Sequence, residues 1–358
     1  MKTLIFTNTP AHVHLYKNVA KRLEATGYEV LVLARSDECT EALLSYYELP
    51  YETYGKRSES LHSLAWELPS HLRTIAPRAR GFDPDVIFGK GPYAAAAGTV
   101  SKTPTVAVLD SETSFDHVIA RPFVRAILTP DAFQKDLGRK HHTFSGVTEL
   151  AYLHPDSFEP DPAVRDALGV ERDEPYVIVR FNAFNGHHDV GKKGFSIEQR
   201  RHLLSELSER ATVFVSDERS ELVTDGTEAQ PFDLHPAQMH DALAEAALLV
   251  ADTQTMVTEA ALLGTPAIRS NSFVGADDMG NFIELEEHGL IRNLESFDAV
   301  LEQSRTLLAD ETARETWERR RDEYVSGANN VTELLYEIAV TYCDSQQSSA
   351  ATRAREVS

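Results

Sequence analysis

Apolar and polar residues in the first half of the chain alternate between strand-like and helix-like patterns. Short apolar runs are separated by segments in which apolar residues recur every three or four positions, as at Leu15, Val19 and Leu23. Short runs of this type suit strands that are buried on both faces of a parallel sheet. We expect strands at 3–7, 29–34, 85–88, 105–109 and 126–129, and helices at 14–26, 41–47, 61–75 and from residue 93 onward.

The second half repeats this alternation after a segment, 154–175, that shows little periodicity and several Asp-Pro or Glu-Pro turns. The pattern predicts an α/β fold with two Rossmann-like doubly wound domains facing a central cleft. We expect an N-terminal domain at 1–158, a C-terminal domain at 159–343, and a disordered Ser/Ala/Gln-rich tail at 344–358. The expected elements of the second half are strands at 176–180, 211–215 and 248–250, and helices at 197–209, 239–246, 256–263, 299–323 and 331–343.

The segment 246–268 has the most informative pattern in the chain. A short apolar run is followed by a polar turn, then by a helical stretch that Gly264 and Pro266 end. Such a turn presents helix N–H groups at the carboxyl edge of the sheet, where phosphate binds well. We therefore expect the helix amides to contact phosphate and Glu259 to bind ribose hydroxyls, with Gln254, Thr255 and Thr258 as further candidate substrate-binding residues.

Histidines follow the first predicted strand, in the loop that leads to the first helix. His12 or His14 at this position would face the expected cleft, and imidazole is the side chain best suited to proton transfer near neutral pH. His12 is the candidate catalytic residue. The alternative is that these rings cap the helix or pack in an interface.

Basic residues near two other strand ends are candidates for phosphate contacts. Lys90 lies between two glycines after a strand, although a tight turn explains this pattern equally well. Arg180, His188 and Lys192 belong to a polar, Gly-rich segment that we interpret as a pyrophosphate site, with a solvated hinge loop as the alternative. Adjacent histidines such as His187 and His188 seldom bind one ion, so we predict neither a metal nor a cofactor.

The composition narrows the function class. Asp and Glu total 56 against 35 Lys and Arg, of which only 10 are Lys, and the formal net charge is −21. Such a chain is a poor candidate for binding nucleic acid through a broad basic surface. Low Lys with abundant acid suggests adaptation to molar salt, where the Debye length is about 3 Å. This hypothesis predicts unfolding or loss of activity on dialysis into dilute buffer.

The chain has the size and apolar content of a two-domain protein. It has 358 residues, 42% of them hydrophobic. No apolar run approaches the length of a transmembrane helix, and the N-terminus does not resemble a secretory signal, so we expect a cytoplasmic protein. Cys39 and Cys343 show neither disulfide nor zinc spacing.

Several of these motifs resemble a known family. The opening Asn8-x-Pro10-x-His12-Val13-His14, the segment from Arg180 to Gly191, and the block from Thr255 to Pro266 resemble the uncharacterised DUF354 family across 1–343. The same motifs are similar to those of GT-B sugar-nucleotide enzymes, among them a lipid-linked GlcNAc transferase and the non-hydrolysing UDP-GlcNAc 2-epimerases.

The resemblance implies a GT-B glycosyltransferase that uses a nucleotide sugar, with UDP as the expected nucleotide. In that scheme Glu259 binds ribose, Thr255, Thr258 and Arg180 stabilise the leaving diphosphate, and His12 deprotonates the acceptor. The acceptor is unknown, and a lipid-linked acceptor with peripheral membrane contact is one option. The oligomeric state is open.

Two alternatives remain. The first is an epimerase. The UDP-GlcNAc 2-epimerases have a pair of glycines and two consecutive Glu in this turn. This chain has Gln254-Thr255 in place of the glycines and Thr258 in place of the first Glu. A non-catalytic nucleotide-sugar-binding protein is the other alternative, and in it His12 would have no chemical role.

Overall fold

The computed structural model describes residues 1–56, 61–112, 116–182, 194–217, 224, 226–275 and 278–356. The chain forms two compact units. Unit 1 comprises Met1–Tyr152 and Asn329–Ser358, and unit 2 comprises Leu153–Ala328. The chain therefore passes from unit 1 to unit 2 after Tyr152, a few residues before the boundary that we expected at 158–159. It returns to unit 1 at Asn329.

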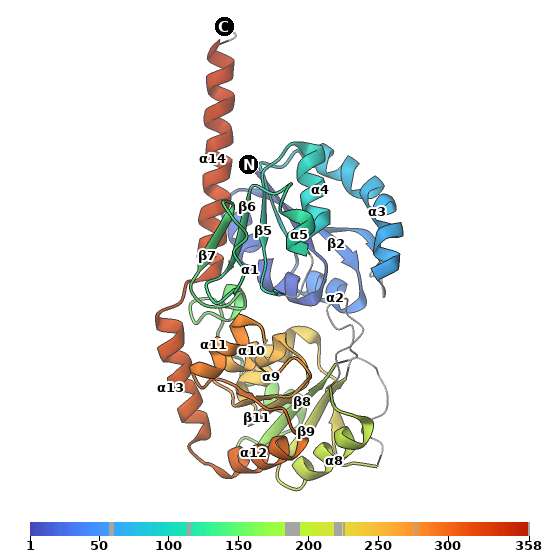
Figure 1. Cartoon of the computed structure of the whole chain (residues 1–358), viewed down its shortest axis with the longest axis vertical. Helices are drawn as coiled ribbons and strands as arrows, with labels where there is room; N and C mark the ends of the chain where they lie inside the picture. Colours follow the sequence, from blue (N-terminus) through green and yellow to red (C-terminus); the bar gives the residue numbers. More distant parts are fainter. Residues whose placement is uncertain are drawn as a thin grey trace. The chain divides into compact units, whose positions relative to one another are not determined.

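Unit 1 is built on a parallel sheet of seven strands in the order β3-β2-β1-β4-β5-β6-β7 (Figure 1). Helices α1 and α2 pack on β2, whereas α4 packs on β4 and β5 with α3 and α5 beside it. The strands are β1 (Lys2–Thr7), β2 (Glu29–Ser36), β3 (Tyr51–Lys56), β4 (Val86–Gly89), β5 (Thr105–Val108), β6 (Ala126–Pro130) and β7 (His141–Phe144). The helices are α1 (Pro10–Ala25), α2 (Glu38–Tyr46), α3 (Leu61–Phe82), α4 (Pro92–Ser101), α5 (Asp116–Ala120), α6 (Leu150–Leu153, at the boundary) and α14 (Val331–Glu356).

Unit 2 has a parallel sheet of six strands in the order β10-β9-β8-β11-β12-β13. Val177, Val179 and Phe181 of β8 alternate toward an apolar core that α8 and α12 complete, while Tyr176 bonds the main chain of α9. The strands are β8 (Tyr176–Phe181), β9 (Thr212–Asp217), β10 (Gln230–Pro231), β11 (Leu248–Ala251), β12 (Ala267–Arg269) and β13 (Arg292–Asn293). The helices are α7 (Val164–Leu168), α8 (Ile197–Ser208), η1 (Pro236–Gln238), α9 (Met239–Glu245), α10 (Thr255–Leu262), α11 (Gly280–Glu287), α12 (Phe297–Ala309) and α13 (Ala313–Ser326).

The two sheets have the same topology, because six strands of each follow the doubly wound order 3-2-1-4-5-6 when numbered within their own unit. The α/β fold with two Rossmann-like doubly wound domains is confirmed. In each unit the direction of winding reverses between two central strands, β1 and β4 in unit 1 and β8 and β11 in unit 2. We call this place the winding point of the unit. Ligands of open parallel sheets bind at such points, outside the carboxyl ends of the strands.

The C-terminal helix is longer than we expected. α14 packs against α1 and continues to Glu356, so the segment from Asp344 that we expected to be disordered is helical. Gln, Ala and Arg are good helix formers, which explains why a stretch with little apolar periodicity extends an existing helix. Within the described residues, the helices are all too short or too polar to cross a membrane.

Candidate functional site

In unit 1 the winding point between β1 and β4 gathers the N-terminal candidates. Asn8 and His12 follow β1, Lys90 follows β4, and Asp110 lies just beyond β5. All four therefore lie at the carboxyl edge of the sheet. The side-chain amide of Asn8 lies 3.5 Å from the carbonyl oxygen of Lys90, so the two loops are in direct contact.

His12 sits in the first turn of α1 and is partly exposed. Its Nδ1 accepts the backbone N–H of Asn8 at 3.2 Å. A neutral imidazole that accepts at Nδ1 carries its proton on Nε2. His12 in this arrangement can donate a proton from Nε2, and base catalysis through the ring requires the other tautomer or loss of the Asn8 bond.

Lys90 is paired with Asp110, a residue that we did not predict. Lys90 Nζ lies 2.5 Å from Asp110 Oδ1. Burial alone would raise the pKa of Asp110, but the Lys90 ammonium, its hydrogen bond and nearby His12 together hold this pKa below its usual range. Asp110 is thus a carboxylate near neutral pH and offers a negative charge beside His12. Its position directly after an apolar strand was the signal for it.

The glycines around Lys90 have structural reasons. Gly91, the N-cap of α4, has a φ of 79°, which favours glycine. A Cβ on Gly89 would lie 2.8 Å from the Cβ atoms of Phe6 and Ala94. The tight-turn interpretation therefore accounts for the pattern, and the phosphate role of Lys90 stays a prediction.

A buried cation lies at the end of β2. Arg35 is 9% exposed, and a bulge against β3 occurs at this residue. Arg35 Nη2 donates to the hydroxyl of Tyr93 at 3.1 Å, and His71 Nδ1 lies 3.0 Å from the same hydroxyl. Among the described residues Arg35 has no carboxylate partner, and its buried Nε has no hydrogen bond. Burying an unpaired cation costs several kcal/mol, which suggests a ligand role.

Unit 2 places the C-terminal candidates at its own winding point, between β8 and β11. Arg180 lies near the end of β8, where Nη1 donates to the hydroxyl of Ser216 at 2.6 Å. Gln254 and Thr255 follow β11, and Thr255 is exposed. Gln254 is the N-cap of α10 but makes no side-chain cap bond. The start of α10 therefore lies at the carboxyl edge without a side-chain cap on its first backbone N–H groups.

A buried carboxylate anchors the main chain at this point. Asp252 is fully buried and accepts the backbone N–H of Asn182 at 2.6 Å and of Phe195 at 3.3 Å. Arg200 lies 3.5 Å from Asp252 and from Asp217, and donates to the carbonyl oxygens of Asn182 and Phe195. Burial raises the pKa of Asp252 to about 6, against the lowering effect of these hydrogen bonds and of Arg200.

These contacts hold the main chain at Asn182 and at Phe195, which lie on either side of the segment 183–193. Our candidates His188 and Lys192, with His187, fall in this segment and lie outside the described residues. Arg200 was not predicted, because a helix-borne arginine in a charged sequence carries no signal of burial. Across the described residues no group of three or more potential metal ligands occurs.

Glu259 is less accessible than the sequence suggested. It is 6% exposed, and its Oε1 lies 3.0 Å from Nε2 of His240, which is itself 2% exposed. His240 belongs to α9, and Phe158 contacts its ring edge-to-face. Thr258 is fully buried, with a hydroxyl that makes no hydrogen bond within the described part of the chain. The Thr258 side chain therefore lies on the buried face of α10.

The structure therefore collects the candidates in two sets. His12 and Lys90 lie in unit 1, while Arg180, Gln254, Thr255 and Glu259 lie in unit 2 with Thr258 beneath them. Of the residues that we did not predict, Asp110 contacts the candidate Lys90 and His240 contacts the candidate Glu259, whereas Arg35 and Arg200 bond residues beside the candidates.

Comparison with solved structures identifies the fold. The UDP-GlcNAc 2-epimerase from Neisseria meningitidis, solved with UDP-GlcNAc, superposes with a TM-score of 0.66 at 13% identity, covering 95% of this chain and 100% of that chain. The glycosyltransferase VinC in complex with DTDP gives 0.64 at 15% identity, covering 96% and 100%. Anabaena Alr3699/HepE with UDP-glucose gives 0.60 at 17% identity, covering 98% and 100%. At this identity the similarity establishes the GT-B-type fold.

Comparison with known sequences identifies the family. The uncharacterised protein MJ0665 of Methanocaldococcus jannaschii is 23% identical over 281 residues, which cover 73% of this chain and 79% of that protein. The family model described as "Protein of unknown function (DUF354)" matches residues 3–315. The chain therefore belongs to the DUF354 family and has the two-domain fold of GT-B sugar-nucleotide enzymes.

Proposed function

We propose that this protein is a glycosyltransferase that takes its sugar from a nucleoside diphosphate donor, with UDP as the expected nucleotide. The observation that carries the proposal is the winding point of unit 2, where the exposed and uncapped start of α10 lies at the same sheet edge as Arg180. Backbone N–H groups and a guanidinium are the groups that bind a diphosphate without a metal.

The donor roles follow from this arrangement. Thr255, the amides at the start of α10 and Arg180 stabilise the diphosphate as negative charge develops on it during transfer. Gln254 hydrogen-bonds the donor beside them. Glu259, oriented by His240, binds the ribose hydroxyls through the small part of its carboxylate that reaches the surface. We assign no direct contact to the Thr258 side chain, because its hydroxyl is buried. His188 and Lys192 stay predictions for the diphosphate.

The acceptor roles fall to unit 1. His12 takes the proton of the acceptor hydroxyl after its bond to Asn8 exchanges, and Asp110 stabilises the imidazolium that forms. Lys90 keeps Asp110 ionised. Arg35, which has no carboxylate partner in the described part of the chain, gives this edge a buried positive charge, so the acceptor is expected to carry a negative group. Glycans and glycolipids with phosphate or carboxylate groups meet this requirement.

The first test is isothermal titration calorimetry with UDP, UDP-GlcNAc and phosphate, at several salt concentrations. The proposal predicts that UDP and the UDP-sugar bind far more tightly than phosphate, and that Arg180→Ala weakens both. Arg201→Ala, an exposed arginine of the same unit, is the matched control. No binding of any nucleotide, at any salt concentration where the protein is folded, would refute the donor assignment.

The second test separates transfer from epimerisation. UDP-GlcNAc is incubated with the protein alone and followed by proton NMR. Formation of the manno epimer without an acceptor would establish the epimerase alternative. Binding without turnover, also after candidate anionic acceptors are added and with the His12→Ala variant identical to wild type, would establish the binding-protein alternative.

A further inference from the structure

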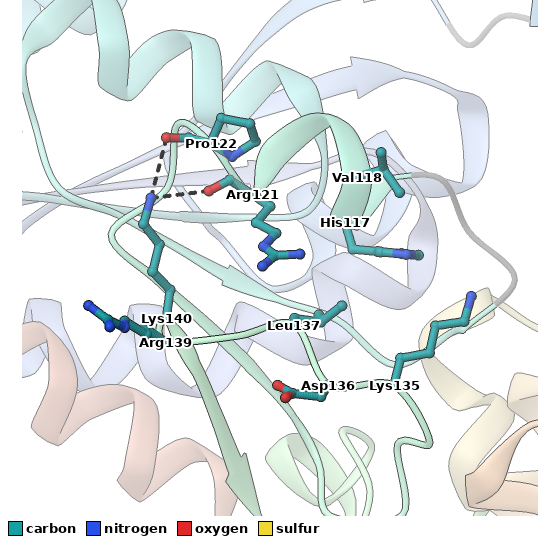
Figure 2. A pocket seen from close by; sticks show the side chains of 9 residues that line it. All are labelled: His117, Val118, Arg121, Pro122, Lys135, Asp136, Leu137, Arg139 and Lys140. Carbon is teal, nitrogen blue, oxygen red and sulfur yellow. Dashed lines mark hydrogen bonds between the residues drawn. The ribbon is translucent and has the colours of Figure 1, made fainter.

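A cavity of about 850 Å³ opens in unit 1, away from the residues discussed above. It lies between α5 with the turn after it and the loop that joins β6 to β7 (Figure 2). Gly138 of that loop has a φ of 82°, and a Cβ there would lie 2.7 Å from Nη2 of Arg121. The glycine lets the loop approach the arginine closely. The cavity is lined by His117, Val118, Arg121, Pro122, Lys135, Asp136, Leu137, Arg139 and Lys140.

Four of the lining side chains are cations, namely Arg121, Lys135, Arg139 and Lys140. None of the four forms an ion pair with another described residue, in a chain that has 56 acidic and 35 basic residues. The one acidic residue of the lining, Asp136, has a side chain that is 90% exposed and lies 4.0 Å from His141. The lining therefore carries four cations against one carboxylate, and its charge is net positive.

Main-chain carbonyls hold the two lysines in place. Lys140 Nζ donates to the carbonyl oxygens of Arg121 and Pro122 at 3.1 and 3.3 Å, as Figure 2 shows. Lys135 Nζ donates to the carbonyl oxygen of Glu112 at 2.5 Å. Neutral carbonyls position an ammonium but leave its charge available, so the cavity is preorganised for an anion.

Exposed apolar side chains adjoin the same cavity. Val118 is 59% exposed, Ile119 48% and Phe123 59%, and together they make up most of the large apolar side chains that are exposed in the described structure. Their neighbours His117 and Ala120 are buried, so the exposed side chains point outward. Apolar residues beside unpaired cations are the combination that binds the surface of an anionic membrane.

We propose that this basic–apolar surface, Val118–Phe123 with Lys135, Arg139 and Lys140, docks the protein on an anionic lipid bilayer. A lipid phosphate occupies the cavity, and Val118, Ile119 and Phe123 enter the headgroup region. A second copy of the chain fits less well, because a two-fold interface would set these cations against each other. The net charge of −21 does not prevent docking, since salt screens charges beyond about 10 Å. The proposal is independent of the nucleotide-sugar assignment.

The test is vesicle co-sedimentation of the full chain over a series of salt concentrations. Phosphatidylcholine vesicles are compared with vesicles of phosphatidylcholine and phosphatidylglycerol. We expect binding to the mixed vesicles alone, weakening as salt rises. Protein that stays in the supernatant with both vesicle types, at every salt concentration where it is folded, would overturn the proposal.

Two variants with matched controls test the surface itself. Arg121→Glu is expected to lower the partition coefficient about tenfold or more, and Phe123→Ser several-fold. Arg201→Glu makes the same charge change, and Ile197→Ser removes an apolar side chain that is 51% exposed, both in unit 2. These controls should bind vesicles as wild type does. Equal loss in variants and controls would contradict the assigned surface.

Two other occupants give distinct results. If soluble pyrophosphate displaces the protein from vesicles completely and Phe123→Ser has no effect, the cavity binds a free anion and the lipid assignment is wrong. If Arg121→Glu or Phe123→Ser instead changes the molecular mass in sedimentation velocity, the surface is an interface between protein chains, which also overturns the proposal.

Discussion

The two units wind their sheets in the same order, yet their winding points differ in character. In unit 1 the charged side chains Lys90 and Asp110 pair at a partly exposed edge, with His12 beside them. In unit 2 the central carboxylate, Asp252, is sealed from solvent and holds main chain. One fold thus places paired, partly exposed charges at the sheet edge of one unit and a buried carboxylate under the main chain of the other. Our proposal assigns the acceptor to the first edge and the donor to the second.

The largest effect is expected from removing the cation of the unit 2 scaffold. Arg200→Ala leaves Asp252 and Asp217 without their shared guanidinium in a buried setting. Breaking a buried pair on one side costs about 3–5 kcal/mol, so unit 2 should unfold at markedly lower urea. Arg201→Ala is the control and should stay within about 0.5 kcal/mol of wild type. A loss as small as that of the control would show that unit 2 does not depend on the buried network.

The next effect is a pH dependence of the free energy of unfolding of unit 2. The wild-type protein should show it and the Asp252→Asn variant should lack it. The folded-state pKa of Asp252 is about 6, above the ordinary value of 3.8. The folded state therefore binds the proton more tightly, and the stability that this contributes at low pH is lost as pH rises through about 6. The difference amounts to about 3 kcal/mol at most. Urea titrations of both proteins between pH 4 and pH 7 measure it, and parallel curves would contradict the buried state of Asp252.

A smaller effect is expected on nucleotide affinity. Glu259→Gln keeps a hydrogen bond to His240 but removes the carboxylate charge, so UDP binding should weaken by about 1–3 kcal/mol. Glu198→Gln, at an exposed site on α8, is the control for the same chemical change. Calorimetric affinity equal to wild type would remove Glu259 from the donor site and leave it as a structural partner of His240.

The smallest effect is expected in unit 1. The Lys90–Asp110 pair is partly exposed, so Lys90→Ala should cost about 1 kcal/mol or less. Because the pKa of Asp110 is lowered in the folded protein, the pair stabilises unit 1 above the usual titration range of aspartate, and this contribution is lost as pH falls. The urea unfolding curves of Lys90→Ala and wild type should therefore differ at neutral pH and converge at acidic pH. The exposed Arg80→Ala should differ from wild type equally at both pH values.

Strands with an unbroken apolar run were predicted well, because burial on both faces leaves a clear pattern. β8 and β11 are examples. β3 and β7 were not predicted, since they are edge strands with polar residues that face solvent. The single helix expected at 299–323 is two helices, α12 and α13, because Asp310 and Glu311 interrupt it.

The candidate site was predictable where a residue directly follows a strand. This placed His12, Lys90, Gln254 and Thr255 at the correct sheet edges, since the carboxyl ends of parallel strands share one edge. Accessibility was not predictable, because it depends on partners from other elements. Glu259 is covered by His240 of α9, and no pattern within α10 indicates this contact.

Hydrogen exchange with and without UDP tests the central claim most directly. Run in a salt concentration where the protein is folded, the experiment locates the nucleotide rather than merely detecting it. The account predicts that UDP slows exchange at the start of α10, from Thr255 to Glu259, and at the end of β8, while the edge of unit 1 is unchanged. Slowed exchange only in unit 1, or no change anywhere at saturating UDP, would contradict it.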